Sequence, residues 1–260
     1  MRKNKLISAI LVSATIFSVA NAGSLTREEG KGFYSLTYYY YTSDKYYDDN
    51  RNSHTTDRFH KHELNYYLEY GLKDDLMFTF QTALDYVTQS GDSAVGVGDF
   101  ELGLTKRVYY NNGNVLSVRG VGIIPGLYNR NERPYIGLGR FGAEAGVGAG
   151  VYRDRFYIDN FLGYRYYSGG ADFIRDVLMV GVKLTPRWEY VGLFDLWYGI
   201  DGNPRGSYTI SPKQRYLQFY NTLRYRYTPT TSFIAGFSVN LYAENAGAGN
   251  HLYVGIWQEF

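Results

Sequence analysis

The residues of this chain that could carry chemistry are charged side chains at alternate positions of strand-like segments. If the strands form a barrel, every second position faces a common lumen, and both acidic and basic residues fall there. Such groups would pair as salt bridges in a narrow interior or form a ladder that selects solutes by charge. The candidate lumen-lining residues are Glu63, Asp85, Asp99, Glu101, Arg107, Arg119, Glu144, Arg165, Arg175, Lys183, Glu189, Asp195, Tyr220, Arg224 and Arg226.

Pairing across the barrel is the favoured interpretation, because buried charges need partners. The alternative is a separation of charge across the lumen, in which acidic residues of the second to fourth predicted strands, within 57–111, face a basic side. That basic side would consist of Arg165, Arg175, Lys183, Arg224 and Arg226. The sequence leaves both interpretations open.

A glycine motif, Gly137-Leu-Gly-Arg-Phe-Gly142, matches the dinucleotide-binding pattern. That pattern requires a strand that leads into a helix, and the surrounding sequence predicts neither, so no cofactor is expected. If Glu144 faces the lumen, then so do Gly142, Gly146, Gly148 and Gly150. Strand glycines mark a bend or a close approach by another group. This row predicts either a clear passage along the wall or simple barrel curvature.

The histidines offer little chemistry. His60 and His62 share a strand face with His54 nearby, but they lack a defined third ligand, so no metal site is expected. His251 has no recognisable serine partner, so the chain is not expected to be an enzyme.

Twelve segments alternate with the period of a half-buried strand. In 75–89, for example, Leu76, Phe78 and Phe80 oppose Thr79 and Gln81. The predicted strands are 32–43, 57–71, 75–89, 96–111, 114–126, 138–152, 155–168, 173–185, 188–200, 215–228, 231–243 and 250–260. The predicted fold is all-β, a single antiparallel up-and-down transmembrane barrel of about 12 strands.

The connections alternate in length, as they do in outer-membrane barrels, which have short periplasmic turns and longer external loops. The short ones are 71–75, 111–114, 153–155, 185–187 and 228–231. The longer ones are 44–56, 90–95, 127–137, 169–172, 201–214 and 244–249. With an even number of strands, this arrangement predicts that both termini are periplasmic.

The amino-terminal 22 residues have the three parts of a secretory signal: a basic start, an apolar stretch over 6–19, and Ala20-Asn-Ala22. We expect cleavage after Ala22, leaving residues 23–31 as a short periplasmic tail before the barrel of 32–260. Cleavage removes three positive charges, so the 27 Lys and Arg fall to 24, against 25 Asp and Glu. A mature chain this close to neutral predicts no nucleic-acid partner.

The remaining composition favours the outer membrane of a Gram-negative bacterium, with outer-membrane lipid around the barrel. The 29 Tyr suit the aromatic girdles of membrane barrels. The terminal Phe260 is predicted to face lipid, which places Trp257 and Glu259 inside. A final strand that ends in this residue also predicts recognition by the barrel-assembly machinery.

The stretch from Gly96 to Arg107, followed by Val115 to Gly126 and the glycine-rich strand 137–150, resembles the outer-membrane barrel family named for the meta-cleavage pathway of phenol degradation. The resemblance implies a transporter or channel for small, aromatic or hydrophobic solutes, and no binding residue is carried over from it. Two alternatives stay open. One is a non-conducting structural or interaction barrel that displays its outer loops, and the other is an envelope lipid-modifying enzyme.

Overall fold

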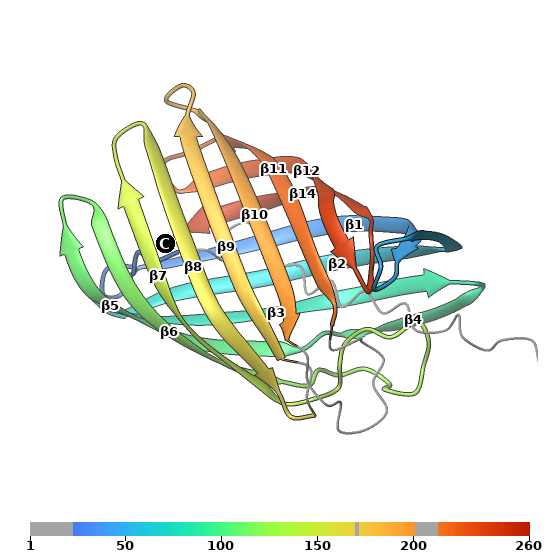
Figure 1. Ribbon diagram of the computed structural model, residues 1–260. Helices are drawn as coiled ribbons and strands as arrows, with labels where there is room; N and C mark the ends of the chain where they lie inside the picture. The colour runs from blue at the N-terminus through green and yellow to red at the C-terminus, as the bar shows by residue number, and fades with distance from the viewer. Residues whose placement is uncertain (1–22, 170–171, 201–212) are drawn as a thin grey trace, which may run out of the picture.

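Alternating burial runs along every long strand of the protein. In the last strand His251 and Tyr253 are 2% and 3% exposed, whereas Leu252 and Val254 between them are 63% and 56% exposed. Successive strand residues point to opposite faces, so this pattern requires a sheet with an enclosed side and an open side. The computed structural model describes residues 23–169, 172–200 and 213–260, and in these the sheet closes into a barrel (Figure 1).

The strands of the described residues follow the chain in order. They are β1 (Gly32–Tyr47), β2 (Ser53–Lys73), β3 (Leu76–Gln89), β4 (Asp92–Val97), β5 (Phe100–Asn111), β6 (Asn114–Ile124), β7 (Gly142–Tyr152), β8 (Phe156–Tyr167), β9 (Asp172–Lys183), β10 (Trp188–Ile200), β11 (Arg215–Arg226), β12 (Thr231–Glu244), β13 (Ala246–Gly247) and β14 (Asn250–Glu259).

These segments make a barrel of twelve strands. Both β4 and β5 pair with β3, and both β13 and β14 pair with β1, so each of these two pairs occupies a single position in the wall. Every pairing is antiparallel, and the β1–β2 pairing closes the sheet. The predicted fold class and strand number are confirmed.

Several predicted boundaries differ from the structure. The predicted loop 44–56 shortens to 48–52, because β1 continues to Tyr47 and β2 begins at Ser53. The segment 90–95, predicted as a loop, is a tight turn at Ser90 and Gly91 with φ of 56° and 87°, after which β4 begins at Asp92. The predicted strand 138–152 begins only at Gly142, because residues 125–141 form an irregular loop that lies partly inside the barrel. Turn residues and inward loops both interrupt the alternation on which the prediction rests.

The five short turns gather at one end of the barrel, where the carboxy terminus also lies (Figure 1). There the backbone N–H of Gly32 donates to the carbonyl of Phe260 at 2.8 Å, and the N–H of Phe260 donates to the carbonyl of Gly32 at 2.9 Å. The first and last strands are therefore aligned at the short-turn end.

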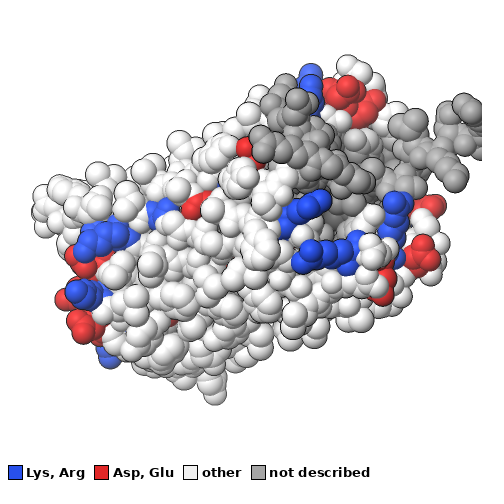
Figure 2. Space-filling view, turned by 90° about the horizontal axis from the view of Figure 1, so that it is seen from below, with Lys and Arg blue, Asp and Glu red and all other residues white. Residues whose placement is uncertain are grey.

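The outer face of the barrel is largely apolar. Exposed Leu, Val, Ile, Phe and Tyr side chains occupy outward positions of the strands. In Figure 2 charged side chains gather towards the two ends of the visible face and leave a broad uncharged band between them. No helix within the described ranges is long and apolar enough to cross a membrane.

Candidate lumen constriction

The centre of the lumen contains an ion-pair network across several strands. Arg165 on β8 binds Glu101 on β5 through two nitrogens, at 2.8 and 3.0 Å, and Glu144 on β7 through Nε at 2.7 Å. All three residues are at most 4% exposed. A guanidinium offers its donors in a planar fork, so one arginine can hold two carboxylates in fixed orientations.

A second arginine extends this network along the wall. Arg175 on β9 lies 3.7 Å from Glu144 Oε2 and 3.5 Å from Asp195 Oδ1. The indole of Trp197 on β10 packs against both guanidiniums, with Cζ of Arg165 and Arg175 at 5.1 and 5.3 Å from its ring centroid. Acidic and basic groups thus alternate along this series of contacts from Glu101 to Asp195, which supports the pairing interpretation over a separated basic side.

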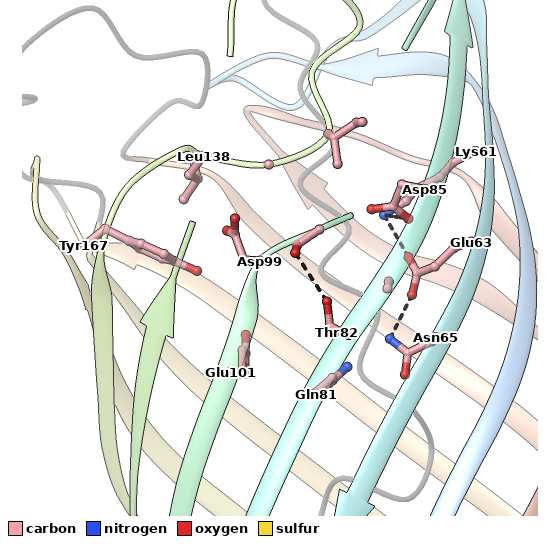
Figure 3. A pocket seen from close by; sticks show the side chains of 14 residues that line it. Lys61, Glu63, Asn65, Gln81, Thr82, Asp85, Asp99, Glu101, Leu138 and Tyr167 are labelled. Atoms are coloured by element: carbon pink, nitrogen blue, oxygen red, sulfur yellow. Dashed lines mark hydrogen bonds and ion pairs between the residues drawn. The ribbon is translucent and has the colours of Figure 1, made fainter. Parts of the chain in front are cut away.

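A second charged cluster lies on the neighbouring part of the wall. Lys61 Nζ is 2.7 Å from Glu63 Oε2 and 3.2 Å from Asp85 Oδ1, and all three side chains are buried. Asn65 Nδ2 donates to Glu63 at 3.0 Å. Figure 3 shows these β2 side chains on one edge of a cavity that has Glu101 on another. Lys61 was not among the predicted lumen residues, although it lies two positions before Glu63 and so faces the same side of β2.

The loop 125–141 covers this cavity. Asp99 Oδ1 accepts hydrogen bonds from the Tyr128 hydroxyl at 2.7 Å and the Gly126 N–H at 3.1 Å. Ile136 and Leu138 pack against the buried aromatic and aliphatic residues of the inner wall. The cavity beneath measures about 40 Å³, which accommodates a few water molecules at most. The described residues therefore leave little free space in this cavity.

The glycine motif of residues 137–142 belongs to this loop and to the first residue of β7. No described residue near it is helical, so the structure lacks the context of a dinucleotide site. A Cβ on Gly137 would lie 2.6 Å from the Tyr128 hydroxyl, and Gly139 has φ of 63°. These glycines allow the loop to pack closely around Tyr128.

The other end of the lumen contains the segment 23–31. The N–H of Ser24 donates to both carboxylate oxygens of Asp159, at 3.1 and 2.9 Å, and its hydroxyl donates to Oδ2 at 2.8 Å. Arg27 Nε donates to Glu69 Oε2 at 2.7 Å. Ser24 and Thr26 are 1% and 6% exposed. The segment predicted as a periplasmic tail thus lies within the barrel end.

This segment explains part of the glycine row on β7. A Cβ on Gly148 would lie 3.1 Å from Ser24 Cβ, and one on Gly150 would lie 2.4 Å from Ser24 Oγ. At Gly146 the added atom would meet Phe161 and the carbonyl of Leu162. The row is therefore not the clear passage that the sequence suggested as one possibility. The absence of side chains in this row leaves room for the chain's own amino-terminal segment.

A larger cavity adjoins the segment. It measures about 340 Å³, and its wall includes Phe33, Tyr157 and Trp257. Two arginines stand at this wall, with Arg27 over the Phe33 ring and Arg224 over the Trp257 ring at 4.8 and 5.0 Å. A cavity with aromatic and cationic walls can hold a small planar solute.

Three predicted lumen residues lie instead at the short-turn rim: Arg107, Lys183 and Arg226. Lys183 is exposed at the last position of β9, and Arg226 is the last residue of β11. The backbone N–H of Arg107 bonds to the carbonyl of Asp75 in a turn, and a register shift follows between residues 107 and 109. Strand pairing places Arg107 opposite Ser117, Lys183 opposite Glu189 and Arg226 opposite Ser232, and all three partners are buried. These residues therefore keep the inward direction but lie at the mouth of the barrel.

The remaining candidates lie on the inner wall. Arg224 Nη1 pairs with Glu189 at 3.2 Å. The Arg119 guanidinium lies 5.4 Å from the Phe161 ring centroid, and Tyr220 stacks on His251 at 5.6 Å.

His251 has a serine partner that the sequence did not reveal. Ser238 Oγ lies 2.7 Å from His251 Nδ1, and it accepts the His251 N–H at 3.0 Å and Gln218 Nε2 at 2.8 Å. The pair arises from the β12–β14 register, which sequence alone does not specify. Both residues are buried.

The other histidines lie on the outer face or at the start of β2. His60 and His62 bond to the hydroxyls of Tyr40 and Tyr38, and His54 pairs with Asp48 at 2.9 Å. Within the described residues, no group of three or more acidic, histidine or cysteine side chains is arranged to hold a metal ion.

Comparison with known proteins finds matches among solved structures only; no protein-family model and no curated protein matches the chain. The COG4313 outer membrane channel from Pseudomonas putida F1 superposes with a TM-score of 0.77 at 17% identity, over 91% of this chain and 98% of that chain. The chain has the fold of an outer-membrane β-barrel. This barrel is also similar to the NanC porin, with a TM-score of 0.56 at 9% identity over 86% of this chain and 98% of that one.

The translocator domain of the autotransporter NalP from Neisseria meningitidis is a third similar barrel, with a TM-score of 0.51 at 8% identity over 90% of each chain. A channel, a porin and a translocator domain share this architecture, so at such identities the likeness identifies the fold and not the cargo. A closed barrel with an apolar outer face is one of the few structures that can span a bilayer. The predicted outer-membrane location is confirmed.

Proposed function

We propose that the protein is a passive, selective channel for small solutes across the outer membrane. The observation that carries the proposal is the polar, charged inner face inside an apolar outer face. A barrel that served only as a scaffold could fill its core with apolar side chains, because buried ion pairs add little stability over packed apolar residues. Retaining Arg165, Glu101 and Glu144 in the lumen supports a path for polar groups or water.

The narrowest level of this path is the ion-pair network of Arg165, Arg175 and their carboxylate partners, beside the loop 125–141. Solutes there would meet charges of both signs at short range. The cavity of about 40 Å³ leaves little free space, so passage requires local movement of the loop or of the paired side chains. Low and selective flux is expected, in contrast to the open lumen of a general porin.

The proposed solutes are small and aromatic or otherwise hydrophobic, as the family resemblance implies. The cavity at the short-turn end supports this choice, because its volume of about 340 Å³ exceeds the roughly 150 Å³ that suffices for benzene in an apolar cavity. Its arginines favour solutes that carry an anionic group beside the ring.

A liposome flux assay tests the proposal. Vesicles that contain the purified protein are compared with empty vesicles for uptake of aromatic, sugar, nucleoside and fatty-acid solutes. The channel proposal expects increased uptake of some aromatic solutes, and that uptake should change when Glu101 and Glu144 are both replaced by Gln. A sealed barrel over the whole panel would contradict it and favour the non-conducting interaction barrel.

A further inference from the structure

The carboxylate of Asp159 is fully buried and lacks a cationic partner among the described residues. Its hydrogen bonds come from the Ser24 N–H, the Ser24 hydroxyl and the Tyr152 hydroxyl. None of the ion pairs within the described ranges includes it. The carboxylates of Glu101, Glu144 and Asp195, by contrast, are each paired with an arginine. Burying an ionised carboxylate without a counter-charge is costly, so a cation beside Asp159 would stabilise its charged form.

A second carboxylate lies beside the same part of the chain. A Cβ on Gly23 would be 3.8 Å from Glu69 Oε1. Glu69 is 3% exposed, and it binds Arg27 Nε at 2.7 Å and the Tyr67 hydroxyl at 2.9 Å. Around Gly23 and Ser24 there are therefore two buried carboxylates and one guanidinium. That guanidinium, of Arg27, pairs with Glu69. With both carboxylates ionised, the described residues of the site would carry one more negative charge than positive charge.

The position of Gly23 supplies a candidate for a balancing positive charge. Gly23 precedes the residue whose N–H binds Asp159, and consecutive Cα atoms are about 3.8 Å apart, so the Gly23 nitrogen is close to the carboxylates. In the uncleaved chain this nitrogen is a neutral amide. Cleavage after Ala22 would convert it into an ammonium group.

We propose that Asp159 and Glu69 form a binding site for the α-ammonium group of Gly23, created when the leader is removed. The ammonium balances the charge of the site, and the N–H and hydroxyl of Ser24 donate hydrogen bonds beside it. Gly148 and Gly150 leave the space that the segment occupies. Removal of the leader thus fixes residues 23–31 in the barrel end, whether or not the barrel conducts solutes. The inference rests on the predicted cleavage position.

The first test is the titration of the Gly23 amine. The mature protein is taken from outer membranes, its intact mass is measured, and its amines are reductively methylated with a carbon-13 label, which preserves their charge. The bound ammonium should titrate at least about one pH unit above the ordinary range of roughly 7.7–8.0, because two carboxylates stabilise the charged form. A mature chain that does not begin at Gly23, or a Gly23 amine with an ordinary titration, would overturn the proposal.

Two variants distinguish the ion pair from simple packing. In Asp159→Asn the titration should return towards the ordinary range, whereas Asp154→Asn, a change of equal charge in an exposed turn, should leave it unchanged. Folding of each barrel is checked by its migration in unheated electrophoresis.

An aminopeptidase provides a second readout that does not depend on conduction. Folded wild-type protein in detergent should lose Gly23 about tenfold more slowly than Asp159→Asn, because the amino terminus must first leave its binding site. With an extra Ala placed before Gly23, digestion should remove the Ala quickly and then slow at Gly23. Equal rates for wild-type protein and Asp159→Asn would contradict the proposed site.

Discussion

Arg165 on β8 binds both oxygens of Glu101 on β5, although two strands of the barrel lie between them. The contact spans the two intervening strands on the inner face of the barrel. It joins two parts of the chain that are 64 residues apart, and both side chains are buried. The same interaction therefore links separate parts of the barrel wall and forms part of its charged inner face.

Removing this arginine should destabilise the barrel. In Arg165→Met, Glu101 and Glu144 lose their shared guanidinium, and breaking a buried ion pair costs about 3–5 kcal/mol. Urea unfolding in detergent measures the change. Arg226→Met at the rim should alter the free energy of unfolding by less than about 0.5 kcal/mol. Adding Glu101→Gln and Glu144→Gln to Arg165→Met should restore much of the stability; no recovery would argue against charge as the cause.

A side chain at Gly148 should displace the amino-terminal segment. In Gly148→Val the new Cβ would lie 2.6 Å from Ser117 Oγ and 3.1 Å from Ser24 Cβ. Residues 23–31 should then be digested by protease several-fold faster, and flux through the channel should rise. Gly120→Val is the matched control, because Gly120 is exposed with no atom within 4 Å of its added Cβ. Equal protection in both variants would show that Ser24 is held elsewhere.

The loop between β1 and β2 should titrate at low pH. A hydrogen bond from His54, supported by the N–H groups of Asn52 and Asn50, lowers the pKa of Asp48 from 3.8 to about 2. A carboxylate with a lowered pKa stabilises the folded loop above its ordinary pKa, and that contribution is lost as the pH falls through about 2. The amide chemical shifts of Asn50 and Asn52 should report this midpoint. In His54→Ala the midpoint should move towards 3.8.

Phe260 should matter more for assembly in cells than for the finished barrel. Its ring covers Gly32, where an added Cβ would lie 2.1 Å from the ring, and packs beside Tyr34 at 6.3 Å. We propose that the assembly machinery recognises this terminal aromatic residue. Phe260→Ala should reduce the folded protein in outer membranes several-fold and leave refolding in detergent nearly unchanged. Leu252→Ala, on the same outer face, is the control. An equal loss in both variants would contradict a specific role for the terminus.

Ser238 should act as a structural partner of His251 and not as a nucleophile. Its oxygen already accepts two hydrogen bonds, and the pair is buried. Ser238→Ala should lower the free energy of unfolding by about 1–3 kcal/mol, because the imidazole loses its partner. Urea unfolding measures this change. Labelling of Ser238 by a fluorophosphonate would instead favour the lipid-enzyme alternative.

Alternation was a reliable guide where a strand runs uninterrupted through the wall. It placed Glu101, Glu144 and Arg165 together on the inner face. Lys61 follows the same alternation and is buried there too, although it was not among the predicted lumen residues. Arg107 and Lys183 also lie opposite buried residues, Ser117 and Glu189, but they are at the short-turn rim. Alternation indicates which face of the sheet a side chain takes, and not how deep in the barrel it lies.

The sequence by itself determined the twelve strands, the short-turn end and the inward parity of most charged residues. These follow from local rules of strand period and turn chemistry. Only the tertiary structure decided that Arg165 reaches Glu101, that Ser238 meets His251, and that Ser24 occupies the space beside Gly148. Such contacts depend on the register between strands, the curvature of the closed barrel and the path of the amino-terminal segment. Residues far apart in the chain fix those three properties together, so no local pattern specifies them.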